Sequence, residues 1–314
     1  MPRRAPIIPA TDLRKRSPRH VGLVILNWNS GSTILESIAS AVASHDADVR
    51  ILIIDNGSTD GSLDLIRKTY PQVTVIANAH NVGVAEGFSQ GAHWALEAGF
   101  SHLLYLNSDA TIQPDCLAIL YKAMLEGNRV GISTPRILDA KREGKIWFDG
   151  GRLNMFGYPI HDGYGVNCDR PAVTHEEDFA TGCAMLVATS VFRTIGAFDA
   201  SYFAYSEDAD FSFRAKAAGF TLLHVPEAIA MHTPSVSIAN NAGKWLRDYY
   251  VTRNALYLRK RYPLKSPTWS FLTYFGGKFL LALPLYYLMT GQLRRFIAVY
   301  EGWRDYLKGV QGGR

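Results

Sequence analysis

Short runs of consecutive apolar residues alternate with longer stretches of mixed polarity along the first third of the chain. Such runs are typical of strands buried on both faces of a sheet, and the mixed stretches have the length of helices. The expected strands are residues 21–26, 51–54, 73–76 and 102–106, and the expected helices are residues 34–43, 60–70 and 84–98. This alternation predicts an α/β fold in which helices flank a mostly parallel central sheet.

The second third of the chain is richer in loops. The glycine-containing stretches 146–151 and 161–165 predict turns and short strands that cover one edge of the sheet. Two more strands are expected at residues 184–188 and 222–225, and a helix is expected at residues 211–218.

Polar residues directly follow three of the expected strands. The three clusters are Asn27-Trp28-Asn29, Asp55-Asn56 and Asn107-Ser108-Asp109. Since the carboxyl ends of parallel strands meet at one edge, where open α/β sheets bind ligands, the clusters predict a single polar site. No Gly-x-Gly-x-x-Gly follows a strand and no Gly-x-x-x-x-Gly-Lys-Ser/Thr occurs, which argues against a dinucleotide site and a P-loop.

Asp109 is the first residue in these clusters with a specific chemical interpretation. A carboxylate after a buried strand is costly unless it is paired or bound to a cation, so Asp109 is a candidate divalent-metal ligand that holds a diphosphate. The alternative is a turn residue or the N-cap of a helix after Pro114. His232 could complete such a metal site if the fold brings it near Asp109, and is otherwise an ordinary loop histidine.

Three carboxylates fall within four residues just before the expected helix at 211–218: Glu207, Asp208 and Asp210. One of them could cap that helix and compensate its dipole. Clustered acids repel unless a cation or a raised pKa relieves them, which makes a general base the sharper interpretation.

The net charge of +5 describes no single part of the chain. Residues 1–20 carry six basic residues against one acidic residue, a net +5. Residues 21–248 carry 16 basic and 25 acidic residues, a net −9, and residues 249–314 carry 11 basic and 2 acidic residues, a net +9. An acidic central body argues against nucleic-acid binding, which needs clustered basic residues.

The cysteines and the N-terminal segment indicate a reducing compartment. The three cysteines, an odd number without a Cys-x-x-Cys pair, argue against a disulfide scaffold. Residues 1–20 lack the apolar core of a signal peptide and are expected to form a flexible basic arm.

Taken together and in this order, the motifs resemble glycosyltransferase family 2, and in particular its bacterial rhamnosyltransferase-type branch. The matching segments are Val24-Ile-Leu-Asn-Trp-Asn29, Ile54-Asp-Asn-Gly-Ser-Thr-Asp60, Asn81-Val-Gly83, Leu106-Asn-Ser-Asp109, Thr181-Gly-Cys-Ala184, Gly196-Ala-Phe-Asp199, Tyr205-Ser-Glu-Asp-Ala-Asp210 with Arg214, and His232. The resemblance covers about residues 21–260. It implies a GT-A fold, with a Rossmann-like central sheet, over residues 21–248.

The resemblance also implies a role for each matching residue. Asp208 is the expected catalytic base, Asp109 and His232 are the expected ligands of Mg²⁺ or Mn²⁺, and Asp55 is expected to contact the nucleotide base. Residues expected to bind the donor nucleotide are Asn27, Trp28, Asn29, Asp55, Asn56, Asn81, Gly83, Asn107 and Ser108. Residues expected to support the base and the acceptor are Glu207, Asp210 and Arg214.

Three departures from the family pattern affect these assignments. Asn107 replaces the first acid of the Asp-x-Asp motif, which leaves less negative charge for the metal. The asparagines that usually occur near Phe88 and Ser89 are absent, which affects donor-sugar contacts. The Gln-x-x-Arg-Trp motif of processive members is also absent, so one sugar is expected to be added per encounter.

The basic C-terminal extension, residues 249–314, contains an apolar stretch at 269–289. The stretch approaches a membrane-spanning length, but Lys278 and Pro284 argue against spanning. The basic residues at 259–261 and 294–295 favour helices that lie on an anionic membrane surface. A core helix pair or a homo-oligomer contact is the alternative.

The leading hypothesis is therefore an inverting glycosyltransferase that moves rhamnose from dTDP-rhamnose to a lipid-linked or polysaccharide acceptor in cell-envelope glycan synthesis. Its expected location is the cytoplasmic face of the bacterial membrane. One alternative is a transferase of the same fold that uses a UDP-hexose or UDP-galactofuranose. Another is an inactive subunit that binds a nucleotide-sugar or a membrane, which only the change at Asn107 favours.

Overall fold

The computed structural model describes residues 20–44, 48–171, 173–233, 243–262 and 267–314. The predicted basic arm at residues 1–20 lies almost entirely outside the described residues. The first half of the described chain contains β1 His20–Asn27, α1 Thr33–Val42, β2 Asp48–Asp55, α2 Ser62–Thr69, β3 Thr74–Ala77, α3 Val84–Glu97, β4 His102–Asn107, β5 Ala110–Ile112, α4 Cys116–Glu126 and β6 Val130–Asp139. The strands and helices predicted up to residue 106 are thus confirmed, and β5 was not predicted.

The second half adds short strands and then helices. The elements are β7 Ile146–Phe148, β8 Gly151–Leu153, β9 Pro159–His161, β10 His175–Glu176, β11 Ala184–Ala188, α5 Thr189–Ile195, η2 Ala200–Tyr202, α6 Glu207–Ala217, β12 Thr221–His232, α8 Gly243–Arg261, α9 Thr268–Gly276, η3 Gly277–Ala282, α10 Leu283–Met289 and α11 Leu293–Leu307. The predicted strand at 222–225 is the beginning of β12, which extends to His232.

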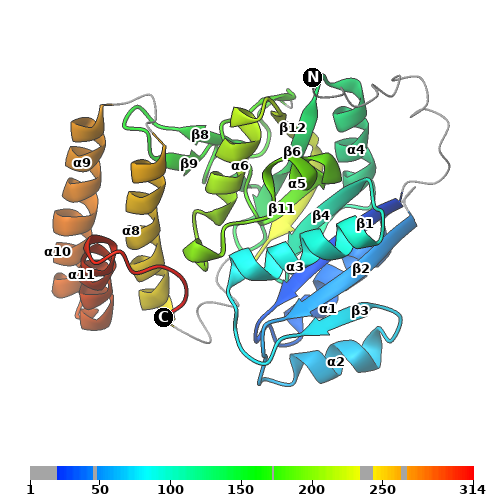
Figure 1. Ribbon diagram of the computed structural model, residues 1–314, viewed down its shortest axis with the longest axis horizontal. Helices are drawn as coiled ribbons and strands as arrows, with labels where there is room; N and C mark the ends of the chain where they lie inside the picture. The colour runs from blue at the N-terminus through cyan, green and yellow to red at the C-terminus, as the bar shows by residue number, and fades with distance from the viewer. Residues whose placement is uncertain (1–19, 45–47, 172, 234–242, 263–266) are drawn as a thin grey trace, which may run out of the picture.

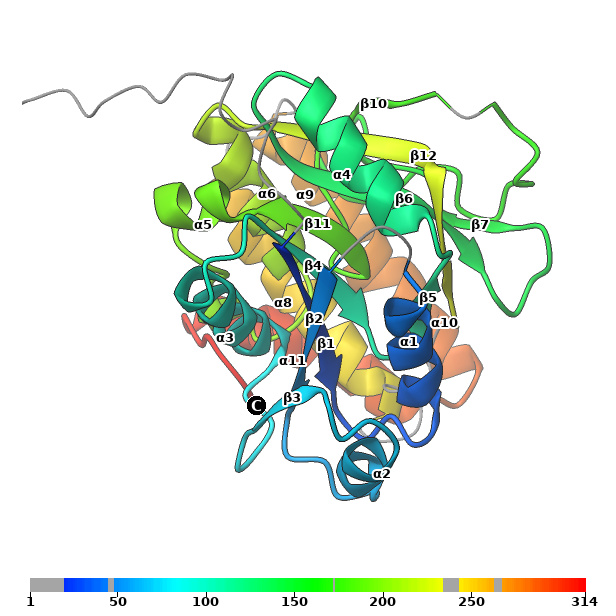
Figure 2. The same cartoon turned by 90° about the vertical axis from the view of Figure 1, so that its right-hand side faces the viewer.

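The central sheet has the strand order β10-β12-β6-β11-β4-β1-β2-β3. Strands β3, β2, β1 and β4 are parallel neighbours, as are β6 and β12. Strand β11 lies antiparallel between β4 and β6 and joins the two parallel parts. Helices α3 and α1 cover opposite faces of the sheet (Figure 2), which is why its strands are apolar on both faces.

Helix α6 begins earlier than the sequence indicated. The predicted helix at 211–218 starts at Glu207, so the acidic cluster forms the first helical turn instead of preceding the helix. Carboxylates in that turn compensate the exposed N–H groups and the positive end of the helix dipole, which favours the earlier start. Aromatic packing links the helix to the sheet, since the Phe211 ring stacks on Phe198 at a centroid distance of 4.3 Å and Phe198 packs edge-on against Tyr105 of β4 at 5.4 Å.

The C-terminal helices pack together beside α6, at the end of the molecule away from β2 and β3 (Figure 1). Elements α9, η3 and α10 follow one another without a break, and Phe271, Phe275 and Phe279 pack between them and helices α8 and α11. Residues Thr268–Met289 are long and apolar enough to cross a membrane by length and composition alone, with a mean hydropathy of 1.2 in the most apolar window. Helix α8 runs through the domain boundary predicted at residues 248/249, and that boundary stays a prediction.

Most arginines of this helical region are already paired with acids. Arg295 Nε donates to Asp248 Oδ2 at 2.7 Å, and Arg294 Nη1 donates to Glu301 Oε2 at 2.7 Å. Arg261 Nη1 lies 2.6 Å from Asp199 Oδ2. The +9 charge of the extension therefore does not form a uniformly basic surface, and the charge argument for membrane binding is weaker than the sequence suggested.

Candidate active site

The carboxyl ends of β1 and β2 form one hydrogen-bonded polar cluster. Asn27 Nδ2 donates to Asp55 Oδ1 at 2.7 Å and to Ser62 Oγ at 2.9 Å, and both Asn27 and Asp55 are buried. Asp55 Oδ2 accepts from the Ser58 amide at 3.0 Å. Asn29 Oδ1 accepts from the Thr59 amide at 2.7 Å, which ties the loop after β1 to the loop after β2. The structure thus brings together Asn27, Asn29 and Asp55, three of the residues predicted to bind the donor nucleotide.

A second set of amides extends the cluster toward α3. Asn56 Nδ2 lies 3.3 Å from Asn81 Oδ1 and 3.1 Å from the Gly83 carbonyl oxygen. Gly83 has a φ of +89°, and a Cβ at this position would lie 2.6 Å from the Phe203 side chain. Glycine is required here because only it combines this backbone conformation with such a close approach.

The end of β4 contributes the third cluster. The Asn107 amide donates to the Cys183 carbonyl oxygen at 2.9 Å, and Ser108 Oγ accepts from Ser30 Oγ at 2.7 Å. Trp28 is half-buried beside Asn27 in the chain. All three predicted clusters therefore lie at the same edge of the sheet, and their donor-binding role stays a prediction.

Asp109 and His232 are brought together by the pairing of β5 with β12. His232 pairs with Ala110 in the register of these strands, and its Nε2 lies 3.2 Å from Asp109 Oδ1. Both side chains are buried. The alternative role of Asp109 as a helix N-cap is wrong, because α4 begins at Cys116 and its N-cap is Asp115.

This pair fits a divalent cation. Two ligands on adjacent vertices of an octahedral cation, with bonds of about 2.1 Å, lie about 3.0 Å apart, close to the separation of Asp109 Oδ1 and His232 Nε2. No group of three or more His, Cys, Asp or Glu side chains within the described residues could hold a metal. Further ligands would therefore come from a bound diphosphate or from water.

Asp208 lies in the first turn of α6, across from the end of β4. Its Oδ2 accepts from the Gly182 amide at 3.1 Å and its Oδ1 accepts from the Ala209 amide at 2.8 Å. Cys183 follows Gly182 in the chain, and its carbonyl oxygen accepts from the backbone amide of Asn107, two residues before Asp109. Burial raises the pKa of the Cys183 thiol, and the negative charges of Asp109 and Asp208 raise it further. The proposed base and the metal pair therefore converge on one region.

The two adjacent acids, Glu207 and Asp208, form no ion pair with a cation among the described residues. Burial raises the pKa of Glu207 well above its ordinary value, and the Asp208 charge adds to this effect. Burial also raises the pKa of Asp208, although backbone N–H groups oppose the shift. The Glu207 Oε2 atom is buried without a hydrogen-bond partner. A carboxylate with a raised pKa in a water-poor site has the properties of a general base.

A strained loop presents these acids. Phe203, Tyr205 and Ser206 all have positive φ values, between 63° and 70°, which side chains rarely adopt. The Asn254 amide of α8 lies 2.8–2.9 Å from the carbonyl oxygens of Tyr202, Ala204 and Tyr205. The strain is therefore held in place by the C-terminal helices, as is usual for backbone strain at functional sites.

Asp210 and Arg214 lie on the other side of α6 and connect elements of the fold. Arg214 Nε donates to Asp210 Oδ2 at 2.9 Å, and Asp210 Oδ1 also accepts from Tyr262 Oη at 2.8 Å. Arg214 in addition donates to the carbonyl oxygens of Ile195 and Ala197. The observed contacts are structural, and the predicted support of the acceptor by these two residues stays a prediction.

Sequence reasoning missed an aromatic wall beside His232. The Trp147 ring lies 4.3 Å from the His232 ring and 4.5 Å from the His161 ring, measured between centroids. Burial lowers the pKa of His161 to about 4, which makes it neutral at physiological pH. The glycine-containing stretches 146–151 and 161–165 were the only sequence signal for this wall.

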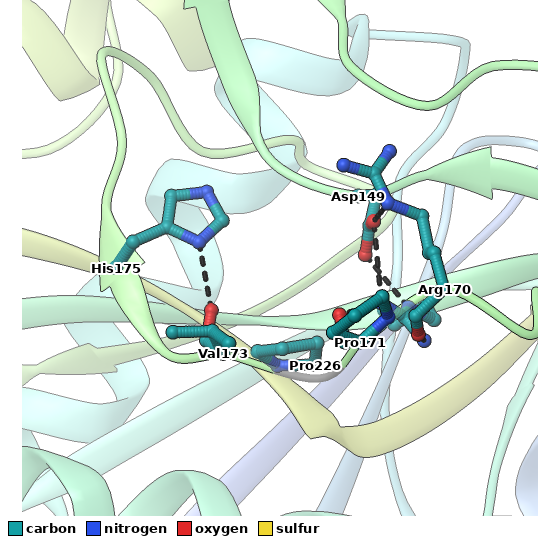
Figure 3. A pocket seen from close by; sticks show the side chains of 7 residues that line it. Asp149, Arg170, Pro171, Val173, His175 and Pro226 are labelled. Carbon is teal, nitrogen blue, oxygen red and sulfur yellow. Dashed lines mark hydrogen bonds and ion pairs between the residues drawn. The ribbon is translucent and has the colours of Figure 1, made fainter.

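A separate cavity of about 260 Å³ lies outside this site, beside β6 and β12 (Figure 3). Its lining includes Arg136, Asp149, Arg170 and His175. Arg136 Nε donates to Asp149 Oδ1 at 2.7 Å, and Arg170 Nε lies 3.2 Å from Asp149 Oδ2. Both arginines are thus paired within the protein, and the cluster is structural. A second cavity, of about 190 Å³, reaches Asp109 from the side of α1.

Comparisons of sequence identify the family of the chain. The sequence model of the family described as Glycosyl transferase family 2 matches residues 23–186. A curated N-acetylglucosaminyl-diphospho-decaprenol L-rhamnosyltransferase of Mycobacterium tuberculosis is 25% identical over 248 residues, 73% of this chain and 80% of that protein. The rhamnosyltransferase WbbL of Escherichia coli is 27% identical over 164 residues, 49% of this chain and 59% of that protein.

Solved structures agree on the fold. The mannosyltransferase PcManGT from Pyrobaculum calidifontis, solved with GDP-Man and Mn²⁺, superposes with a TM-score of 0.55 at 14% identity, covering 95% of this chain and 92% of that one. GalNAc-T7, solved with UDP, GalNAc and Mn²⁺, has a TM-score of 0.55 at 16% identity, over 82% of this chain and only 57% of its own. The chain therefore belongs to glycosyl transferase family 2, in a branch similar to its rhamnosyltransferases, and has the GT-A fold.

Proposed function

We propose that this glycosyltransferase is a metal-dependent, inverting enzyme that transfers rhamnose from dTDP-rhamnose to a lipid-linked glycan. The observation that carries the proposal is that Asp208 binds the Gly182 amide, while the next residue, Cys183, is hydrogen-bonded to Asn107, two residues before the Asp109–His232 pair. One carboxylate–imidazole pair suits a cation, and one carboxylate with a raised pKa suits a base.

The donor is assigned to the edge of the sheet formed by β1, β2 and β4. Asn27 and Asp55 would face the nucleotide base, and Asn56 and Gly83 would border the same pocket. Asp109 and His232 would hold Mg²⁺ or Mn²⁺ against the diphosphate, and the cation would stabilise the negative charge of the leaving group. Both structural neighbours are proteins solved with Mn²⁺, which supports a divalent cation here.

The reaction itself needs one base. Asp208 would accept the proton of an acceptor hydroxyl, while that oxygen attacks the anomeric carbon from the face opposite the diphosphate. The bond between the anomeric carbon and the diphosphate oxygen breaks, its electron pair leaves with the nucleoside diphosphate, and the configuration inverts. Burial and the Asp208 charge raise the pKa of the buried neighbour Glu207, which favours its protonated form and limits the negative charge beside the base.

Two observations support the acceptor: the exposed C-terminal helices, and the name of the mycobacterial relative, whose substrate is a sugar linked through a diphosphate to decaprenol. Side chains of Thr268–Met289 leave an exposed apolar face, which suits the surface of a membrane. We place the enzyme on the cytoplasmic face of the membrane, where it adds one sugar per encounter.

A panel of nucleotide-sugars tests the donor. Purified protein should consume dTDP-rhamnose in the presence of acceptor, and EDTA should stop consumption until Mg²⁺ or Mn²⁺ is restored. Asp109→Asn should lower kcat/KM by about 100-fold or more, since it removes a charged metal ligand. Asp115→Asn removes an exposed carboxylate and is the matched control. If the protein consumes UDP-galactofuranose or a UDP-hexose instead, that nucleotide-sugar is the donor and dTDP-rhamnose is not. If it binds a nucleotide-sugar without consuming it, the result favours an inactive subunit.

A further inference from the structure

Two adjacent polar residues of α8, Arg253 and Asn254, are fully buried, and we call them the α8 pair. Arg253 Nη2 donates to the Tyr202 carbonyl oxygen at 3.1 Å, and Arg253 Nη1 donates to the Gly312 carbonyl oxygen at 2.8 Å. Arg253 Nε donates to Asn254 Oδ1 at 2.9 Å, which leaves the amide nitrogen of Asn254 to face other acceptors. Helix α8 lies beside α6 (Figure 1), so the α8 pair is placed next to the helix that carries Asp208.

The loop before α6 is bound to Asn254 through its backbone. Asn254 Nδ2 lies 2.8–2.9 Å from three carbonyl oxygens, those of Tyr202, Ala204 and Tyr205. An amide nitrogen carries only two hydrogens, so the three carbonyl groups share them and point at one place. Phe203 and Tyr205 have positive φ values in the same loop, a conformation that costs free energy for a residue with a side chain. The hydrogen bonds of the α8 pair offset that cost.

The strained loop leads directly into the turn that carries the proposed base. Ser206, the N-cap of α6, has a φ of +70°, and Asp208 follows two residues later. From there Asp208 Oδ2 accepts from the Gly182 amide at 3.1 Å. A change of φ at Ser206 would rotate the first turn of α6 and move this carboxylate. The position of Asp208 therefore depends on the conformation of the loop.

The same loop is also bound to the donor side of the site. The Phe203 carbonyl oxygen accepts from the backbone amides of Val84 and Ala85, at 2.6 and 3.1 Å, where α3 begins. These residues directly follow Gly83, which is predicted to border the donor pocket. The loop thus connects the start of α3 to the start of α6, and the α8 pair binds it between these two ends.

We propose that Arg253 and Asn254 are positioning residues for sugar transfer, because they hold the strained loop that sets the place of Asp208 relative to the donor. This inference rests on the proposed function, since Asp208 is the base of that proposal. It gives the C-terminal helices a part in the reaction that is separate from any contact with a membrane.

Transfer kinetics of Asn254→Asp test the assignment, with the nucleotide-sugar that the wild type consumes. The new side chain has nearly the same size but presents an oxygen to the three carbonyl oxygens, so the loop should leave its strained conformation. The kcat per donor-binding site should fall at least tenfold, while the Kd of the nucleotide-sugar should change less than threefold. Asn254→Gln keeps both N–H donors and should retain more of kcat than Asn254→Asp.

Arg295→Met is the matched control for stability. Arg295 joins α11 to α8 through Asp248, so the variant weakens the same helices through a contact that does not involve the loop. Denaturant unfolding should show the lost stability, and kcat per donor-binding site should stay within twofold of the wild type. An equal loss of kcat in Arg295→Met and Asn254→Asp would show that both only loosen the helices, and it would overturn the proposal.

Arg253→Lys decides the question if Asn254→Asp is too unstable to bind the donor. Lysine keeps the positive charge but lacks the planar set of donors that reaches two carbonyl groups at once. The kcat per donor-binding site of Arg253→Lys should fall at least threefold at unchanged Kd, and Arg253→Met should fall further. Wild-type kcat in Arg253→Lys and Arg253→Met would overturn the proposal.

A double-mutant cycle with Asp208→Asn separates this inference from the proposed function. If the α8 pair acts through Asp208, Asn254→Asp should lower kcat less than twofold in a chain that already carries Asp208→Asn. Independent, multiplying losses would overturn the positioning role and leave the base assignment intact. Near-full transfer by Asp208→Asn alone would instead overturn the base assignment, and this inference with it.

Discussion

Two buried clusters of acids in this molecule differ in how their charge is compensated. Asp149, beside β6, contacts Arg136 Nε at 2.7 Å, His224 Nε2 at 3.0 Å and Arg170 Nε at 3.2 Å. Burial alone would raise its pKa, but hydrogen bonds from His224 and Arg136 lower it to about 2. Within the described residues, Asp208 at the proposed reaction centre accepts hydrogen bonds from backbone amides, neither it nor Glu207 forms an ion pair, and burial raises the pKa of both.

This difference separates a carboxylate that only stabilises the fold from one that can take part in proton transfer. A carboxylate surrounded by arginines stays ionised and immobile, and it cannot exchange a proton near neutral pH. A buried carboxylate without a neighbouring cation has a raised pKa, so it gains and loses a proton more readily near neutral pH. Its burial costs free energy, which favourable contacts elsewhere in the fold must offset. Both clusters are rich in charged residues, so composition alone does not separate them.

The largest effect is expected from removing the uncompensated base. Asp208→Asn should lower kcat about 10²- to 10⁴-fold, because the side chain can no longer accept a proton. The Asn side chain has nearly the same size, so donor binding and thermal unfolding should change little. The wild-type rate should rise with pH through the raised pKa of Asp208, since only the ionised form accepts a proton. Near-full transfer by Asp208→Asn, with Asp115→Asn as an exposed control, would contradict the assignment.

Breaking the compensated cluster should change stability instead of catalysis. Arg136→Met leaves Asp149 buried without its closest cation and should lower the free energy of unfolding by about 3–5 kcal/mol. Arg152→Met breaks the exposed pair with Asp162 and should cost about 1 kcal/mol or less. Denaturant unfolding measures both values. If Arg136→Met lost transfer activity per folded molecule while keeping its stability, the two clusters would not differ in role.

A smaller, pH-dependent effect is expected from Glu177, which lies beside the Asp149 cluster. Burial raises its pKa to about 8, although it accepts hydrogen bonds from Thr134 Oγ1 and the Gly151 amide. The folded state thus holds this proton more tightly than the unfolded state. Stability should fall as pH rises from the ordinary carboxyl pKa toward 8, with the full loss present above 8.

Glu177→Gln removes this titration and keeps the size of the side chain. Between pH 5.5 and pH 8.5, the variant should gain about 3 kcal/mol in free energy of unfolding relative to the wild type. Urea unfolding at the two pH values measures the gain, and Glu176→Gln, an exposed neighbour, is the control. Parallel pH profiles for the wild type and Glu177→Gln would show that Glu177 is ionised in the folded protein at both values.

The sequence alone determined the parallel part of the sheet and the polar edge of the site. Buried strands leave a local pattern, and the residues that follow them, such as Asn27, Asp55 and Asp109, must meet when the strands are parallel neighbours. The ordered set of motifs was also sufficient to identify the family.

Only the tertiary structure decided which charges remain uncompensated. The role of Asp109 depended on a contact with His232, more than one hundred residues away, through the pairing of β5 with β12. Whether an arginine of the extension is paired, as Arg295 is with Asp248, likewise depended on how α8 packs against α11. Compensation of charge is a property of side chains brought together from distant positions, and no local pattern encodes it.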